Sequence, residues 1–150
     1  MKILVCGLPG SGKTWLAERL VKHISNCAWY NADFVRKSSS DWDFSKEGRI
    51  RQANRMKTFA DFERSNGRWV ICDFVAPTNK SREAFAPDYV IWLDTIKEGR
   101  VVSSKLSELK NIENLPFDAS TLSQSKEFED TNNVFERPSK IDVHITHFMS

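Results

Sequence analysis

The amino-acid sequence predicts an α/β fold in which a mostly parallel sheet lies between two layers of helices. Short apolar segments of strand length alternate with segments in which apolar residues recur every three to four positions. Because parallel strands need crossover connections, this alternation favours a three-layer architecture with helices on both faces of the sheet. The chain has 150 residues, of which 40% are hydrophobic, and this is enough for the core of a single domain spanning residues 1–150.

The expected strands are five apolar runs, Lys2–Cys6, Cys27–Tyr30, Trp69–Cys72, Tyr89–Leu93 and Ile141–Ile145. Helical spacing predicts three helices between them, Lys13–Ile24, Arg49–Arg64 and Lys80–Phe85. The stretch from about residue 100 to 137 is rich in serine and long for a connection in a compact domain. Such a stretch is usually a functional lid or a mobile insert, and a C-terminal lid segment is the favoured interpretation.

The number of cysteines and the lengths of the apolar runs indicate the cellular compartment in which the protein is expected. Cys6, Cys27 and Cys72 are an odd number and lie in or beside expected strands, which favours buried thiols over a disulfide framework or a metal site. No apolar run reaches the length of a membrane span or of a signal-peptide core. We therefore expect a cytoplasmic protein with no membrane partner.

A formal net charge of +2 is too small to indicate a general nucleic-acid binder, but the charge is unevenly distributed. Residues 1–75 carry 13 basic and 8 acidic side chains, whereas residues 76–150 carry 9 and 12. The basic excess is densest between Arg36 and Arg68. This pattern predicts a local positive field suited to a small anionic ligand, although a solvated helix face explains most of these residues equally well one by one.

A phosphate-binding loop is the most specific motif of the sequence. Gly-Leu-Pro-Gly-Ser-Gly-Lys-Thr at residues 7–14 matches G-x-x-x-x-G-K-[ST] completely, between an expected strand and an expected helix. Such a loop cradles a polyphosphate with its amides; Lys13 is expected to act in catalysis at the terminal phosphates, and the Thr14 hydroxyl to coordinate Mg²⁺. The residues predicted to bind the nucleotide are Gly7, Leu8, Pro9, Gly10, Ser11, Gly12, Lys13 and Thr14. The fold class is thus that of a P-loop NTPase.

The motif by itself predicts binding of ATP or GTP, and a kinase is favoured over a GTPase because no guanine-reading Asn-Lys-x-Asp motif is found; residues 79–82, Asn-Lys-Ser-Arg, lack the Asp. Two acids follow expected strands, where ligands collect in open α/β sheets. Asp33 is predicted to orient or deprotonate an acceptor hydroxyl, with binding of Mg²⁺ through water as the alternative. Asp73 ends a run that resembles a Walker B strand and is predicted to bind Mg²⁺ together with Thr14. A helix cap is the structural alternative for each acid.

Segments over most of the chain resemble, in register, the adenylylsulfate kinase (APS kinase) family. Residues 7–17 are similar to the family's Walker A motif and the helix that follows it. Residues 31–36, Asn-Ala-Asp-Phe-Val-Arg, resemble Asp-Gly-Asp-Asn-Val-Arg, and residues 74–77, Phe-Val-Ala-Pro, resemble Phe-Ile-Ser-Pro. Residues 126–128 and 135–138 are similar to the family's Lys-Asn-Phe and Tyr-Glu-x-Pro.

The resemblance implies a phosphotransferase with an alcohol acceptor that uses ATP and Mg²⁺. In this family the γ-phosphate goes to the 3′-hydroxyl of adenylyl sulfate, a step of sulfate assimilation, and the lid phenylalanine that falls on Phe128 stacks on the substrate adenine. The acceptor residues implied are Asp33, Arg36, Phe44, Arg49, Gln52, Arg55, Phe74, Val75, Lys126 and Phe128. The expected partner is a small nucleotide-like substrate, nucleic acid is expected only as a modified-base substrate, and a homodimer is left open.

Several positions depart from the family pattern. Asn31 and Ala32 replace an Asp and a Gly, Gln52 and Asn54 replace an Asn and an Arg, and Asp73 stands where the family has a small residue. Loss of one arginine from an anion site removes about 1.5–3 kcal/mol, enough to change the preferred acceptor. Two alternatives follow: a phage-type kinase of nucleosides, nucleotides or hydroxymethylated pyrimidines, and a nucleotide-binding regulatory module without transfer activity.

Overall fold

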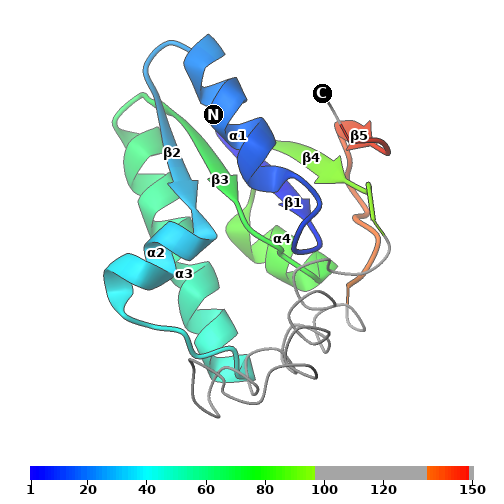
Figure 1. Cartoon of the computed structure of the whole chain (residues 1–150). Coiled ribbons are helices and arrows are strands. Elements are labelled where there is room, and N and C mark those ends of the chain that lie inside the picture. Colours follow the sequence, from blue (N-terminus) through cyan, green and yellow to red (C-terminus); the bar gives the residue numbers. More distant parts are fainter. Residues whose placement is uncertain (97–134, 149–150) are drawn as a thin grey trace, which may run out of the picture.

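A computed structural model describes residues 1–96 and 135–148 and has a five-stranded sheet with helices on both faces (Figure 1). All strand pairs are parallel, in the order β2-β3-β1-β4-β5. The strands are β1 (Lys2–Gly7), β2 (Cys27–Asn31), β3 (Trp69–Asp73), β4 (Tyr89–Leu93) and β5 (Val143–Ile145). The helices are α1 (Lys13–His23), α2 (Ala32–Ser39), α3 (Lys46–Ser65) and α4 (Asn79–Phe85). The predicted α/β fold with a parallel sheet is confirmed.

Two apolar layers result from the alternation of side chains along the central strand β1. Leu4 and Cys6 pack on one face, in a cluster that includes Met56 of α3 and residues of α2 and α4. Ile3 and Val5 point to the opposite face, which α1 covers. Because every strand is parallel, the carboxyl ends of β1, β2, β3 and β4 meet at one edge of the sheet, and the loops that follow them lie together there (Figure 1).

Helix α2 is an element that the sequence patterns did not predict. Asn31 ends β2 and caps α2, since its Oδ1 accepts from the backbone N–H of Phe34 at 3.0 Å. Asp33 therefore lies in the first turn of a helix rather than in a loop. Helix α3 also begins before the predicted Arg49, because the Ser45 side chain caps it by accepting from the Gly48 N–H at 3.2 Å.

The structure bears on only some of the remaining predictions about the lid, the cysteines and the membrane. Of the expected lid, about residues 100–137, only residues 135–137 lie within the described part of the chain. All three cysteines are free; Cys6 and Cys72 are buried and Cys27 is half-buried. In the described residues, no helix combines the length and the apolar character that crossing a membrane requires.

Candidate active site

The phosphate-binding loop connects β1 to α1 and is held against β4. Gly7 has no space for a Cβ atom, which would lie 2.6 Å from the Leu93 carbonyl oxygen. Gly12 has a φ of 101°, a conformation that side-chain-bearing residues rarely adopt. The Thr95 hydroxyl donates to the Ser11 carbonyl at 2.8 Å and ties the loop to the end of β4. The glycines are thus required for the path of the loop as well as for access to phosphate.

Lys13 lies at the start of α1, and its Nζ donates to the Leu8 carbonyl at 3.0 Å, across the mouth of the loop. Burial lowers the pKa of Lys13 to about 8, while the nearby Asp73 carboxylate acts in the opposite direction. Lys13 lines a pocket beside the loop, which we call the phosphate pocket, and Asp73, at the end of β3, lines it too. A cation whose charge is poorly solvated is well placed to gain from an incoming anion such as phosphate.

Asp73 is buried, with 1% of its surface exposed, and its carboxylate accepts three hydrogen bonds. Trp29 Nε1 donates to its Oδ2 at 2.5 Å, and Asn31 Nδ2 and the Thr14 hydroxyl donate to its Oδ1 at 2.9 and 3.5 Å. Burial raises the pKa of Asp73 to about 6, against the opposing effect of these donors and of Lys13. Sequence reasoning missed Trp29 and Asn31, although both lie on β2, the neighbour of β3 in the sheet.

The pair of Thr14 and Asp73 suits Mg²⁺. In the described residues, no group of three or more His, Cys, Asp or Glu side chains could hold a metal ion by itself. Mg²⁺ commonly binds through one or two protein oxygen ligands and completes its octahedron with phosphate oxygens and waters. A hydroxyl and a carboxylate oxygen 3.5 Å apart, beside the phosphate loop, fit that requirement.

A second pocket lies beside the phosphate loop and collects most of the predicted acceptor residues. It is formed by α2, α3, the loop between them and the segment after β3. Its lining residues are Ala32, Asp33, Arg36, Phe44, Arg49, Gln52, Ala53, Phe74, Val75, Ala76 and Pro77. We call it the acceptor pocket. Arg55 does not line it, and Lys126 and Phe128 lie outside the described residues.

Asp33 stands at the boundary between the two pockets. The phosphate pocket contains Lys13, Thr14 and Asp73, and it shares Ala32, Asp33, Phe74 and Val75 with the acceptor pocket. The Asp33 side chain is exposed in the first turn of α2. A group on this boundary can contact a molecule in either pocket, which is the geometry that transfer between two ligands requires.

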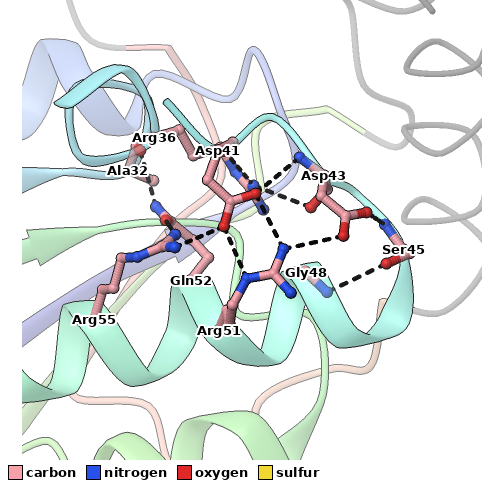
Figure 2. A network of polar contacts seen from close by, with 9 residues as sticks. All are labelled: Ala32, Arg36, Asp41, Asp43, Ser45, Gly48, Arg51, Gln52 and Arg55. Carbon is pink, nitrogen blue, oxygen red and sulfur yellow. Dashed lines mark hydrogen bonds and ion pairs between the residues drawn. The ribbon is translucent and has the colours of Figure 1, made fainter. Parts of the chain in front are cut away.

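The arginines near the acceptor pocket are engaged by the loop between α2 and α3 (Figure 2). Arg36 is buried, and its Nη1 donates to the carbonyls of Asp41 and Asp43 at 3.0 and 3.1 Å. Its guanidinium also lies 4.3 Å from the centre of the Phe44 ring. Arg55 forms an ion pair with Asp41 at 2.6 Å. The positive field expected from the sequence is therefore partly neutralised within the protein.

A third pocket adjoins the phosphate loop on the side of β4 and is lined by aromatic side chains that were not among the predicted site residues. Trp15, His147 and Phe148 line it together with Ser11, Gly12, Leu93 and Thr95. Trp15 also lines the phosphate pocket, so the two cavities are adjacent. The Arg19 guanidinium lies 3.8 Å from the centre of the Trp15 ring and covers one of its faces. A tryptophan directly after the Gly-Lys-Thr of the loop was the available signal.

Residues 3–102 match the family model AAA_18, described as an AAA domain. The chain belongs to this family. A probable adenylyl-sulfate kinase from Aeropyrum pernix is 34% identical over 85 residues, which are 53% of this chain and 46% of that relative. The match thus spans about half of the relative's length. The predicted resemblance to adenylylsulfate kinases is confirmed.

Solved structures share the fold of this AAA-domain chain. The crystal structure of APE1195 is 23% identical, with a TM-score of 0.73, over 97% of this chain and 84% of that one. The structure of Mycobacterium tuberculosis APS kinase CysC in complex with AMPPNP and APS is 18% identical, with a TM-score of 0.68, over 99% of this chain and 89% of that one. The predicted P-loop fold class is confirmed.

Proposed function

We propose that the protein is a single-domain kinase that transfers the γ-phosphate of ATP to a hydroxyl of a small nucleotide-like acceptor. The observation that carries this proposal is the position of Asp33, which lines both the phosphate pocket and the acceptor pocket. A switch or a regulatory module needs a nucleotide pocket, but it does not need an acid between that pocket and a second one. Adenylyl sulfate is the first acceptor to test, on the strength of the resemblance.

Phosphoryl transfer depends mainly on positioning and on neutralising charge. The amides of residues 7–14 and Lys13 would hold the β- and γ-phosphates, and Thr14 and Asp73 would hold Mg²⁺, which supplies charge neutralisation when bound. Asp33 would accept a hydrogen bond from the acceptor hydroxyl and orient its oxygen toward the γ-phosphorus. As the acceptor oxygen bonds to the γ-phosphorus and ADP departs with the bridging oxygen, the proton of the hydroxyl would pass to the Asp33 carboxylate.

The acceptor pocket combines apolar walls with a few charged groups, which suits a planar base that carries a small polar substituent. Phe44 and Phe74 supply aromatic surface, and Arg36 and Arg49 supply positive charge. Lys126 and Phe128 remain proposed acceptor residues on the resemblance alone.

The third pocket is a candidate for the base of the ATP donor, because it adjoins the phosphate pocket at Trp15. Base stacking on an aromatic ring contributes about 1–3 kcal/mol. We therefore expect Trp15→Leu to raise the KM for ATP about tenfold while kcat changes less than about threefold. Steady-state kinetics over a range of ATP concentrations measures both.

Trp15→Phe is the matched control for this prediction, since it keeps an aromatic face and is expected to shift the KM less than threefold. Equal values of KM for the Leu variant, the Phe variant and the unaltered protein would place the base elsewhere.

The proposed function is tested by ADP release from the full chain with ATP, Mg²⁺ and a panel of acceptors. The panel contains adenylyl sulfate, adenosine, AMP, thymidine and DNA with hydroxymethylated pyrimidines. We expect ADP release and a phosphorylated product, identified by mass spectrometry, with at least one acceptor. ATP binding without acceptor-dependent ADP release across the panel would favour a regulatory module and contradict a kinase.

A further inference from the structure

The Asp41 carboxylate holds two arginines that the sequence placed in the basic stretch next to the acceptor pocket. Arg55 Nη2 donates to its Oδ2 at 2.6 Å, and Arg51 donates to both oxygens, from Nε at 3.0 Å and from Nη2 at 3.2 Å (Figure 2). The Asp41 side chain is only 11% exposed. The two guanidiniums hold the pKa of the Asp41 carboxyl well below its usual range, so it remains an anion across physiological pH.

The loop that carries Asp41 is packed directly onto α3. A Cβ atom at Gly48 would lie 2.1 Å from the Asp43 carbonyl oxygen, so this glycine permits the close approach. The Asp43 N–H donates to Asp41 Oδ1 at 3.2 Å, and the Ser45 N–H donates to Asp43 Oδ1 at 2.9 Å. Asp41 is thus held in place by its own loop and by α3.

Arg55 lies immediately behind the wall of the acceptor pocket. Its Nη1 donates to Gln52 Oε1 at 3.4 Å, while Gln52 Nε2 donates to the Ala32 carbonyl at 2.9 Å. Gln52 and Ala32 both line the pocket, whereas Arg55 does not. The Gln52 side chain therefore lies between this guanidinium and the pocket, and the ion pair with Asp41 holds the guanidinium in that position.

The charge that remains in the pocket lining is small. The described charged lining residues are Asp33, Arg36 and Arg49, which sum to a single positive charge. Arg36 already donates from Nη1 to two backbone carbonyls. The single net positive charge of the lining would neutralise only half the charge of an acceptor that carries two negative charges. A further arginine, Arg55, lies nearby, but it is paired with Asp41.

We propose that Asp41 is a specificity-determining residue that withholds Arg55 from the acceptor pocket and thereby disfavours strongly anionic acceptors relative to neutral or singly charged ones. This inference rests on the proposed function only in placing the acceptor in that pocket. It orders the acceptor panel, with the neutral nucleosides adenosine and thymidine ahead of AMP and adenylyl sulfate, and it assigns this order to one carboxylate.

The test is isothermal titration calorimetry of the full chain with adenosine, adenylyl sulfate and inorganic sulfate. Asp41→Asn removes the charge and keeps an oxygen for the Asp43 N–H, so it frees Arg55 for an anion. We expect Asp41→Asn to increase the affinities for adenylyl sulfate and for sulfate about tenfold and to change the affinity for adenosine less than twofold. Asp43→Asn is the matched control, because Asp43 pairs with Arg51 at 3.0 Å and not with Arg55, and it is expected to change none of the three.

Two Arg55 variants complete the design. Adding Arg55→Gln to Asp41→Asn is expected to reverse the tighter anion binding. Arg55→Gln alone is expected to leave adenylyl sulfate affinity within threefold, because Arg55 does not reach the pocket while Asp41 is present.

The proposal is overturned if Arg55→Gln alone weakens the binding of adenylyl sulfate tenfold. It is also overturned if Asp41→Asn changes the affinities for adenosine and for adenylyl sulfate equally. The sulfate titration needs no turnover. Unchanged sulfate binding in folded Asp41→Asn therefore contradicts the role of Asp41, whereas absence of acceptor-dependent ADP release contradicts only the proposed function.

Discussion

Asp33→Asn is expected to lower kcat by about 10²- to 10⁴-fold with whichever acceptor is phosphorylated, while the KM for ATP changes little. General acid–base and positioning carboxylates contribute effects of this size. Asn keeps the shape and one oxygen of the side chain but cannot take up the hydroxyl proton. Asp33 lines both pockets, so the loss is expected in the transfer step rather than in nucleotide binding.

A purely structural role for Asp33 makes a different prediction. As an acid in the first turn of α2, Asp33 interacts favourably with the helix dipole, and its replacement by Asn then costs about 0.3–1 kcal/mol of stability without affecting transfer. Urea unfolding of the variant measures this cost independently of kinetics. An unchanged kcat together with a small loss of stability would move the catalytic role to Asp73.

Asp73→Asn is expected to abolish most activity and yet to make the ligand-free protein relatively more stable at neutral pH. Burial raises the pKa of Asp73 from 3.8 to about 6, so the folded state binds this proton more tightly than the unfolded chain does. The stability that this group contributes is fully present below about pH 4 and is lost as the pH rises to about 6. A shift of two pKa units corresponds to about 3 kcal/mol.

Asparagine mimics the protonated acid and does not titrate. We therefore expect the free energy of unfolding of Asp73→Asn, measured relative to that of the unaltered protein, to increase by about 3 kcal/mol between pH 4 and pH 7, which means that the variant gains relative stability. At pH 4 the variant is expected to be the less stable of the two. Trp29 and Asn31 donate to different oxygens of Asp73, so the amide N–H₂ of the variant has to face one of these two donors. Urea unfolding at several pH values measures the difference.

Activity and magnesium provide the second readout for Asp73. If Asp73 holds Mg²⁺ with Thr14, the variant loses at least about 10²-fold in kcat, while ATP binding measured without Mg²⁺ stays near normal. If the free energies of unfolding of the two proteins change with pH in the same way, burial does not destabilise the charged form of Asp73. Full activity of the variant would remove Asp73 from the metal site.

Much of the fold follows from patterns that are local in the chain. The five strands and the helices α1, α3 and α4 were predicted within a few residues, because their apolar spacing is determined by which faces they bury. Helix α2 was missed because it buries only two adjacent residues, Val35 and Arg36, and its start depends on a single capping side chain, Asn31. The acids Asp33 and Asp73 were found because parallel strands bring their carboxyl ends to one edge.

The sequence by itself determined the phosphate loop, since consecutive residues carry its chemistry on contiguous backbone. Only the tertiary structure decided how the charges around the acceptor pocket are paired. The sequence placed Arg55 in the acceptor site, whereas the structure pairs it with Asp41, which lies on a different element. Charge pairing depends on which side chains meet across elements once the loop packs on α3, and distance in space is information that spacing along the chain does not contain.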